Sequence, residues 1–354
     1  MDKSRLLDIF KNLDKEESGG APYPTLNLHS NSRVLLIDSL NLFLRNFCAL
    51  NHFNRAGNHV GGLTGTLKSL GSLIKTLNPT KIIMCFDGER GSVARKYLYR
   101  PYKANRSATK ITNTRSFSTA EEEKSAKNDQ ITRLVDYLRT LPVQLIVCDN
   151  LEADDIIAHL ATYIPENYPD SLTYIVSSDQ DYLQRVNDRV FVYSPIKHIL
   201  YDTKTVLEEY GIHPFNLNVY KSLIGDTSDN LPGVSGIGQK NIQKLFPDLI
   251  EPKFKGLEYI YETCELKPTK SVLYDRILYV RSTLETMFKL MDLHSPNISD
   301  GDKEEIERVF KQKTKPFDKY QFLLLYNEDL LGDTIPYVDQ WCNVFNPIGY
   351  YREK

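Results

Sequence analysis

Hydrophobic residues recur at two different spacings along this 354-residue chain. Short, uninterrupted apolar runs predict buried strands at residues 34–37, within "KIIMCFDGE", within "VQLIVCD" and at residues 174–176. Between these runs, apolar residues recur every three or four positions, which predicts helices after Asp38, over residues 63–77 with Pro79 as the stop, over residues 129–141, and from Ile156 onward. Strands that alternate with helices predict an α/β fold whose mostly parallel sheet is flanked by helices on both faces.

Carboxylates follow all four predicted strands. In open α/β sheets, the carboxyl ends of the strands form the edge where ligands bind. Any single one of these residues would also serve as a loop residue or a helix cap, as at the start of "NLEADDIIAHL". Seven together would repel one another unless cations neutralise them, and Mg²⁺ or Mn²⁺ suits an all-carboxylate site without histidine or cysteine. They are Asp38, Asp87, Glu152, Asp154, Asp155, Asp179 and Asp181.

A strongly basic segment separates the second and third predicted strands. Residues 90–120 contain no aspartate or glutamate, and they interleave Tyr97, Tyr99 and Tyr102 with their cations. One interpretation is a solvated, disordered charge run. The other is a groove for single-stranded or terminal nucleic acid, which combines cations with stacking rings. The cations are Arg90, Arg95, Lys96, Arg100, Lys103, Arg106, Lys110 and Arg115.

A glycine-rich hairpin is predicted within "SLIGDTSDNLPGVSGIGQKNIQKLF", residues 222–246. The pattern indicates a helix, a tight turn and a second helix. Glycine turns between helices are common, but here two aspartates precede the turn and two lysines share one face of the second helix. Backbone amides and lysines so arranged suit a run of duplex phosphates. The glycines are Gly233, Gly236 and Gly238, and the charged residues are Asp226, Asp229, Lys240 and Lys244.

Composition and charge narrow the class of protein. Hydrophobic residues make up 41% and charged residues 25% of the chain, as in ordinary globular proteins. The chain has no run of about 18 apolar residues, and its first residues lack the apolar core of a signal peptide, so we expect no membrane span and a cytoplasmic protein. Five widely spaced cysteines without a Cys-x-x-Cys motif favour a reducing compartment and argue against zinc.

Five sequence blocks resemble those of one nuclease family. They are "LLIDSLN", "FDGERGSVARKYLYRPYKANR", "LEADDIIA", "VSSDQDYLQRV" and "GDTSDNLPGVSGIGQKNIQKL", in this order within residues 33–250. Together they resemble the 5′-nuclease (flap endonuclease) superfamily, specifically its bacterial and phage 5′→3′ exonucleases and phage-type ribonuclease H. Ser39 stands where many relatives carry glycine, which we expect to be tolerated if the backbone there is not left-handed.

The resemblance implies a fold and a division into domains. The implied fold is a PIN-like nuclease core with a helical arch over residues 90–130 and a helix–three-turn–helix DNA-binding element. We therefore expect an extension over residues 1–32, a core over residues 33–205, and the DNA-binding element with a C-terminal helical region over residues 206–354. We expect the chain from Lys255 onward to be helical and to pack against the core.

The resemblance also implies a two-metal active site. One Mg²⁺ or Mn²⁺ ion is expected near Asp38, Asp87, Glu152 and Asp154, and the other near Asp155, Asp179, Asp181 and Asp229, with Asp226 close by. Asp154 and Asp179, with the cations Lys103 and Arg106, are expected to be catalytic. Nucleic acid is expected to contact Arg95, Lys96, Arg100, Lys103, Arg106, the hairpin glycines Gly233, Gly236 and Gly238, and Lys240 and Lys244, while Tyr102 stacks on a base. The carbonyls of Val234 and Ile237 are expected to hold K⁺.

The function implied is that of a Mg²⁺-dependent 5′ nuclease that removes RNA primers or flaps during DNA replication. Its expected substrates are DNA with a 5′ flap, a nick, or an RNA primer–DNA hybrid, and the balance between exonuclease and flap endonuclease activity stays open. We expect a monomer. The apolar helix predicted in "SRLLDIFKNL" either docks onto a partner, such as a sliding clamp, or packs on the core; a single-strand-binding protein is the other expected partner.

Three other functions are alternatives to a 5′ nuclease. A structure-specific DNA-binding protein without catalysis would keep the hairpin and the basic segment but lose carboxylates, and none of the expected carboxylates is missing. A PIN-type ribonuclease acting on single-stranded RNA would lack the hairpin and the "YKANR" motif, and both are present. A metal-dependent phosphatase of small molecules would need neither of these elements.

Overall fold

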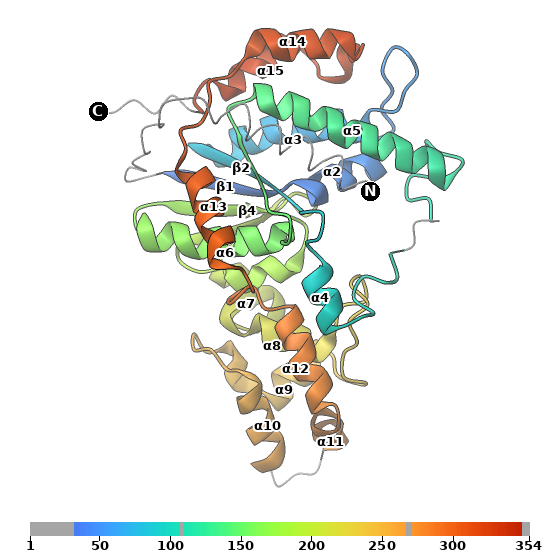
Figure 1. Ribbon diagram of the computed structural model, residues 1–354. Helices are drawn as coiled ribbons and strands as arrows, with labels where there is room; N and C mark the ends of the chain where they lie inside the picture. Colours follow the sequence, from blue (N-terminus) through green and yellow to red (C-terminus); the bar gives the residue numbers. More distant parts are fainter. Residues whose placement is uncertain (1–31, 107–109, 267–270, 349–354) are drawn as a thin grey trace. The chain divides into compact units, whose positions relative to one another are not determined.

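The computed structural model describes residues 32–106, 110–266 and 271–348, which form two compact units (Figure 1). The described part of the first unit comprises residues 32–91, 110–176 and 298–348, and that of the second comprises residues 92–106 and 177–297. The helix predicted near the N-terminus lies outside the described residues. The chain therefore passes from one unit to the other four times, which the predicted division into three consecutive segments did not anticipate.

A parallel sheet forms the centre of the first unit, and its strands have the order β3-β2-β1-β4. Strand β2 is buried along its whole length, as expected for a strand covered on both faces. In the register of the sheet, Asp38 at the end of β1 lies opposite Cys85 near the end of β2. All four strands were predicted, and the α/β fold with a mostly parallel sheet is confirmed. The strands are β1 (Arg33–Asp38), β2 (Lys81–Phe86), β3 (Gln144–Val147) and β4 (Leu172–Val176).

Helices cover both faces of this sheet. Figure 1 shows α2, α3 and α5 on one side of the strands and α6 and α13 on the other. Helix α5 begins nine residues before the predicted start at Asp129, because a capping box between Thr119 and Glu122 starts it in a polar stretch without apolar periodicity. The helices are α2 (Ser39–Ala49), α3 (Gly61–Leu77), α5 (Ala120–Thr140), α6 (Ala153–Asn167), α13 (Asp300–Lys311), α14 (Lys319–Glu328) and α15 (Val338–Cys342), with short 3₁₀ turns at Gly332–Thr334 and Asn343–Phe345.

The C-terminal segment from residue 298 packs against the first unit. Lys81, at the start of β2, is only 2% exposed and donates a hydrogen bond from Nζ to the Gln312 carbonyl at 3.1 Å. Gln144 of β3 donates to the same carbonyl at 2.7 Å, which joins the end of α13 to the sheet. Packing of the tail against the core was predicted, but the grouping of these residues with the DNA-binding element was wrong, because their contacts are made with β2 and β3.

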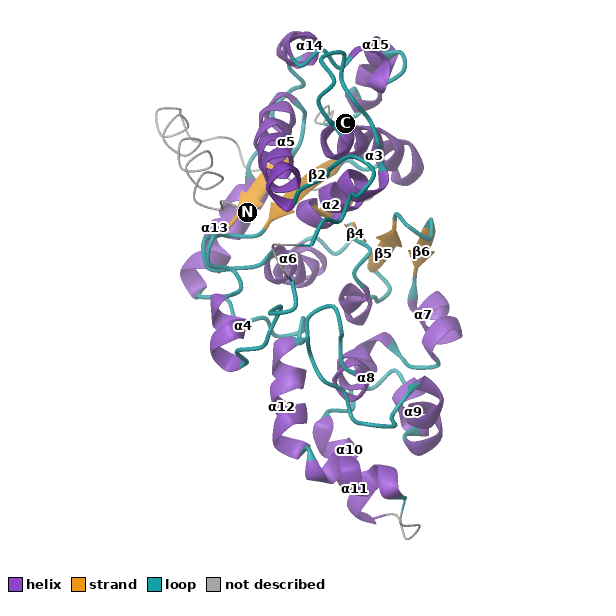
Figure 2. Cartoon of the chain, turned by 90° about the vertical axis from the view of Figure 1, so that its right-hand side faces the viewer, coloured by secondary structure: helices purple, strands orange, loops and turns teal. Residues whose placement is uncertain are grey.

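The second unit is mostly helical. It also contains an antiparallel pair of short strands, which the sequence did not predict because one of them has only three residues. Residues 177–205, assigned in the prediction to the nuclease core, belong to this unit. Its short helices are labelled in Figure 2. They are α4 (Val93–Leu98), α7 (Thr203–Tyr210), α8 (Leu217–Ile224), α9 (Gln239–Leu245), α10 (Leu257–Leu266), α11 (Val272–Tyr279) and α12 (Arg281–Leu290); the strands are β5 (Val190–Ser194) and β6 (Ile199–Tyr201); the 3₁₀ turns are Gln180–Arg185, Pro214–Asn216 and Pro247–Ile250.

Within the described residues, the structure has no helix that combines the length and the apolar character needed to cross a membrane.

Candidate functional site

Two carboxylates of the first unit lie where strands end and helices begin. Asp38 ends β1 and caps α2, accepting a hydrogen bond from the Asn41 backbone N–H at 3.1 Å. Asp87 follows β2, and its Oδ1 accepts from the Ala153 backbone N–H at the start of α6 at 2.9 Å. Ser39 is the first residue of α2 and is absent from the described residues with positive φ, so the serine fits without strain, as expected.

The acidic cluster at the start of α6 forms a reciprocal cap. The Glu152 side chain accepts from the Asp155 backbone N–H, and the Asp155 side chain accepts from the Glu152 backbone N–H at 3.1 Å. Both residues are buried, and Asp154 lies beside them in the first turn of the helix. The positive end of the helix dipole stabilises these carboxylates. Helix capping therefore explains part of this acidic cluster. Because Asp155 and Glu152 each hydrogen-bond to the backbone of the other, we place Asp155 in the same group of carboxylates as Glu152.

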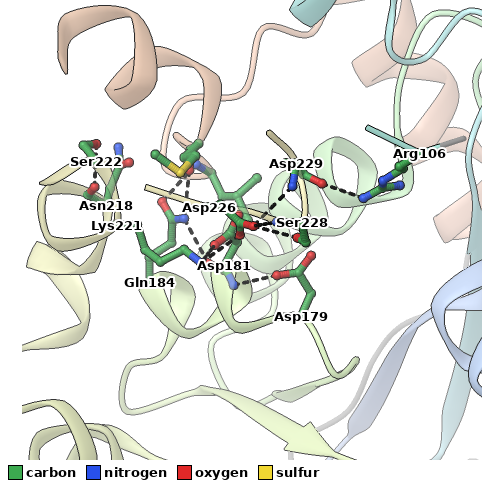
Figure 3. Close-up of polar contacts among 12 residues, drawn as sticks. Arg106, Asp179, Asp181, Gln184, Asn218, Lys221, Ser222, Asp226, Ser228 and Asp229 are labelled. Carbon is green, nitrogen blue, oxygen red and sulfur yellow. Dashed lines mark hydrogen bonds and ion pairs between the residues drawn. The ribbon is translucent and has the colours of Figure 1, made fainter. Parts of the chain in front are cut away.

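A second group of carboxylates surrounds Lys221 in the second unit (Figure 3). Lys221 Nζ lies 2.9 Å from Asp181 Oδ1 and 3.1 Å from Asp226 Oδ2. Asp179 accepts from the Asp181 backbone N–H at 2.9 Å, which ties the segment after β4 into the same group. Ser228 donates from its backbone N–H and its hydroxyl to the other oxygen of Asp226. Residues about 45 positions apart in the sequence thus meet at one lysine, which the sequence did not single out.

Burial and neighbouring charges shift the pKa values of this group in different directions. Burial and then the charge of Asp179 raise the pKa of Asp181 to about 7, although Lys221 acts in the opposite direction. Burial would also raise the pKa of Asp226, but hydrogen bonds from Ser228 and the charge of Lys221 outweigh it and lower that pKa. The Asp181 and Asp226 side chains keep 19% and 16% of their surface exposed. A divalent cation bound in place of the Lys221 ammonium would relieve the repulsion between these carboxylates.

Two predicted catalytic cations lie beside this group. Arg106 Nη2 pairs with Asp229 Oδ1 at 2.5 Å, and its side chain is 57% exposed. Lys103 has a left-handed backbone, with φ of 55°, and its N–H donates to the Asp229 carbonyl at 2.9 Å. The Lys103 ammonium lies 4.7 Å from the centre of the Tyr102 ring. The structure thus brings Lys103 and Arg106 to the loop that contains Asp229, although more than 120 residues separate these cations from Asp229 in the sequence.

The prediction that Tyr102 stacks on a base was wrong for this structure. Tyr102 is 3% exposed and packs in an apolar cluster with Leu231, Met287, Leu290 and Met291. The family resemblance singled out Tyr102 for stacking, because the sequence does not show which ring of the segment the chain buries. Arg95 is also engaged within the unit, since its Nε donates to the Leu290 carbonyl at 3.3 Å, whereas Lys96 and Arg100 are exposed.

The glycine hairpin needs two of its three predicted glycines. A Cβ on Gly233 would lie 1.9 Å from the Ile224 carbonyl oxygen, and Gly236 has a φ of +82°. Gly238 is extended, and a Cβ there would meet nothing within 4 Å, so no contact with the described residues requires glycine at that position; its contact with nucleic acid stays a prediction. The predicted Lys240 and Lys244 are both exposed on α9.

The turn of the hairpin also contacts α11. Arg276 Nη1 donates to the Ser235 carbonyl at 3.0 Å, a contact that the sequence did not indicate. The Val234 carbonyl, predicted to hold K⁺, accepts from the Ile237 N–H at 3.0 Å. An arginine therefore already brings positive charge to the backbone of this turn.

The donors of both groups are carboxylate oxygens, which suit a hard divalent cation. Among the described residues, no three histidine, cysteine, aspartate or glutamate side chains are placed so that they could hold a metal ion as they stand. In the second unit, Lys221 and Arg106 neutralise the carboxylates instead. The chemistry of the donors fits Mg²⁺ or Mn²⁺, and binding would require these cationic side chains to yield their contacts.

Comparison with known proteins identifies relatives along most of the chain. Residues 33–211 match the family described as 5′-3′ exonuclease, N-terminal resolvase-like domain. The 5′-3′ exonuclease of Bacillus subtilis is 32% identical over 275 residues, which cover 75% of this chain and 84% of that protein. DNA polymerase I of Borreliella burgdorferi is 28% identical over 322 residues, which cover 87% of this chain but only 32% of the polymerase. The chain thus spans about a third of that relative.

A solved structure shares the fold. The bacteriophage T5 flap endonuclease, in a complex with DNA and metal ions, matches with a TM-score of 0.63 over 79% of this chain and 100% of its own. The two sequences are 18% identical, so this likeness concerns the fold.

Proposed function

Because the chain belongs to the 5′-3′ exonuclease family, we propose that it is a metal-dependent, structure-specific 5′ nuclease that hydrolyses phosphodiester bonds. One observation carries the proposal. In the second unit, residues 226–229 bring two charged groups together: Asp226 pairs with Lys221, and Asp229 pairs with Arg106. A guanidinium such as that of Arg106 is a common ligand of phosphate. Oxygen ligands for a metal beside an exposed guanidinium are the combination that cleavage of a phosphodiester requires.

We assign each group of carboxylates to one divalent cation. In the first unit these are Asp38, Asp87, Glu152, Asp154 and Asp155, and in the second Asp179, Asp181, Asp226 and Asp229. Bound Mg²⁺ or Mn²⁺ would supply an activated water and stabilise the leaving oxygen. The backbone hydrogen bonds to Asp38, Asp87 and Asp155 would hold the ligand side chains of the first unit in place.

Lys103 and Arg106 would contact the phosphate that is cleaved. Asp229 holds both at rest, Arg106 through its carboxylate and Lys103 through its backbone carbonyl. Because the Arg106 side chain is 57% exposed, its guanidinium could exchange the Asp229 carboxylate for a phosphate without breaking a buried contact network. Preorganised cations of this kind stabilise the charge that develops in the transition state. Lys103 and Arg106 are thus assigned to charge stabilisation, and proton transfer is assigned to neither.

The hairpin would bind duplex DNA beside the cleavage site. Lys240 and Lys244 project from α9 without carboxylate partners among the described residues, so they are available to phosphates. Such contacts position DNA without reading its sequence and weaken as salt rises. We propose DNA with a 5′ flap, a nick or an RNA primer as the substrate. We also propose a role in replication and a location in the cytoplasm of a bacterium or a phage-infected cell. K⁺ at Val234 and Ile237 stays part of this proposal.

One experiment separates this function from its alternatives. The protein is incubated with a 5′-labelled flap, a nicked RNA–DNA hybrid, blunt duplex and single-stranded RNA, each with Mg²⁺ and with EDTA. We expect Mg²⁺-dependent products from the flap and the hybrid, little from blunt duplex, and none with EDTA. Cleavage of single-stranded RNA alone would identify a ribonuclease instead.

Binding without cleavage is the main alternative, and one observation favours it. The carboxylates of the second unit are partly neutralised by Lys221 and Arg106, and no described group holds a metal as it stands. A protein that binds the flap tightly but yields no product with Mg²⁺ or Mn²⁺ would be a structure-specific DNA-binding protein.

A further inference from the structure

The first half of the basic segment is a folded part of the second unit. Helix α4 is attached to α12 by the hydrogen bond from Arg95 Nε to the Leu290 carbonyl. The turn that follows is held by Asn230, whose Nδ2 donates to the Pro101 carbonyl at 2.9 Å. Tyr102 anchors the same turn in the apolar cluster of Leu231 and Met287. A solvated, disordered charge run would make none of these contacts, so α4 presents a defined surface.

That surface combines exposed apolar groups with cations. Val93, Tyr97 and Leu98 are 56%, 93% and 46% exposed, although proteins usually bury large apolar side chains that lie together. Lys96 and Arg100 are exposed beside them, and residues 90–120 contain no acidic residue. The positive charge therefore complements a polyanion. The Tyr97 ring offers a flat surface on which an unpaired base of single-stranded nucleic acid can stack.

We propose that Tyr97 stacks on an unpaired base of a 5′ strand whose phosphates contact Lys96 and Arg100. This inference rests on the proposed function, because it names how the nuclease grips the single-stranded part of its substrate. Every base has a π-face, so the contact favours unpaired strands without favouring a sequence.

The other rings of the segment do not offer the same contact. Tyr102 is buried, and Tyr99 packs against the cluster that buries it. Tyr97 lies on the outer side of α4, one turn after Val93, and the fixed contacts of Arg95 hold that helix in place. The backbone that carries this ring is thus already ordered before a base stacks on it.

The test compares two flaps that differ only in their bases. Full-length protein is titrated, in EDTA to prevent cleavage, against a fluorescent 5′ flap with normal nucleotides and against the same flap with abasic residues, which keeps the phosphates. We expect Tyr97→Ala to weaken binding of the normal flap about tenfold and to leave the abasic flap unchanged, since stacking supplies the difference. Tyr97→Phe keeps the ring and should bind as the wild type does.

A matched control is available in the first unit. Tyr320 of α14 is 80% exposed but lies outside the basic segment, so Tyr320→Ala should bind both flaps as the wild type does. A second readout places 2-aminopurine in the flap, where the wild type and Tyr97→Phe should quench its fluorescence and Tyr97→Ala should not. Unchanged melting temperatures would show that the variants are folded.

The outcomes separate the inference from the proposed function. Equal losses on normal and abasic flaps, or no loss on either, in a protein that still binds and cleaves the flap, would overturn stacking by Tyr97 and leave the nuclease proposal standing. Failure of the wild type to bind or cleave any flap would overturn the nuclease proposal itself.

Discussion

The two units keep their carboxylates together by different means. In the first unit, backbone N–H groups at helix starts satisfy Asp38, Asp87 and Asp155. In the second, the ammonium of Lys221 neutralises Asp181 and Asp226. Backbone donors are fixed once the helices have formed, whereas a side-chain cation can be exchanged for a metal ion. The first group is thus positioned by secondary structure, and the second by a charge balance that a ligand can alter.

The buried lysines of the two units sharpen the contrast. Burial lowers the pKa of Lys81 to about 7. Its ammonium contacts a backbone carbonyl and the ring of Phe310, and neither partner carries a negative charge that would offset the burial. Burial acts in the same direction on Lys221, but Asp181 and Asp226 outweigh it and raise its pKa above the usual range. The pKa values of the two lysines therefore differ in direction because two carboxylates pair with Lys221 and outweigh its burial.

The largest expected effect is the loss of cleavage when a carboxylate is removed from either group. Asp154→Ala in the first unit and Asp179→Ala in the second should each reduce the single-turnover rate by about 10²–10³-fold or more, because the metal loses a ligand. Binding to flap DNA, measured by fluorescence anisotropy in EDTA, should survive, since the phosphate contacts remain. Undiminished cleavage in both variants would refute the assignment of metal ligands.

Removal of Lys221 tests the charge balance of the second unit. Lys221→Ala leaves two largely buried carboxylates without their cation, so we expect the free energy of unfolding to fall by about 3 kcal/mol. Mg²⁺ should restore more stability to this variant than to the wild type, because the metal takes over the role of the ammonium.

The control for this variant is Lys204→Ala in the same unit. Its ion pair with Glu208 is exposed on both sides, so the expected loss is under about 1 kcal/mol. Similar unfolding curves for Lys221→Ala and the wild type, by chemical denaturation with and without Mg²⁺, would show that the lysine does not hold the group together.

The pH dependence of stability tests Lys81. Its pKa is about 7 in the folded chain and near 10.5 when unfolded, so between these values the unfolded state binds more protons. The free energy of unfolding should therefore increase from pH 7 towards pH 10, with a contribution of up to about 1.4 kcal/mol per pH unit. Lys81→Met should remove that contribution. Equal slopes for the variant and the wild type, from urea denaturation at each pH, would contradict the lowered pKa.

The smallest expected effect concerns the hairpin. Gly236→Val places a branched side chain at a φ of +82° and against the Arg276 guanidinium, so we expect strain of roughly 1–2 kcal/mol. We also expect the substitution to reduce affinity for long duplexes more than affinity for very short ones. Gly238→Ala, where a Cβ meets nothing within 4 Å, is the matched control and should bind as the wild type does. Equal losses on long and short substrates would indicate a general folding defect.

Local patterns were sufficient to predict much of this protein. The four strands of the first unit, the helices that follow them and the carboxylates at their ends all follow from short-range hydrophobic periodicity and its interruptions. The need for Gly236 in the hairpin is also local, since its φ of +82° depends on the backbone freedom of that residue itself. Relations of this kind span a few positions, so a single sequence records them.

Only the tertiary structure decided which distant residues meet. It attached residues 298–348 to the first unit through Lys81 and Gln144, placed Lys221 between Asp181 and Asp226, and brought Arg276 to the hairpin. It also buried Tyr102 and exposed Tyr97, two rings only five positions apart in the same basic segment. These outcomes depend on packing between elements far apart in the chain. The energy of each contact depends on the partner that folding supplies, and the residue type alone does not specify that partner.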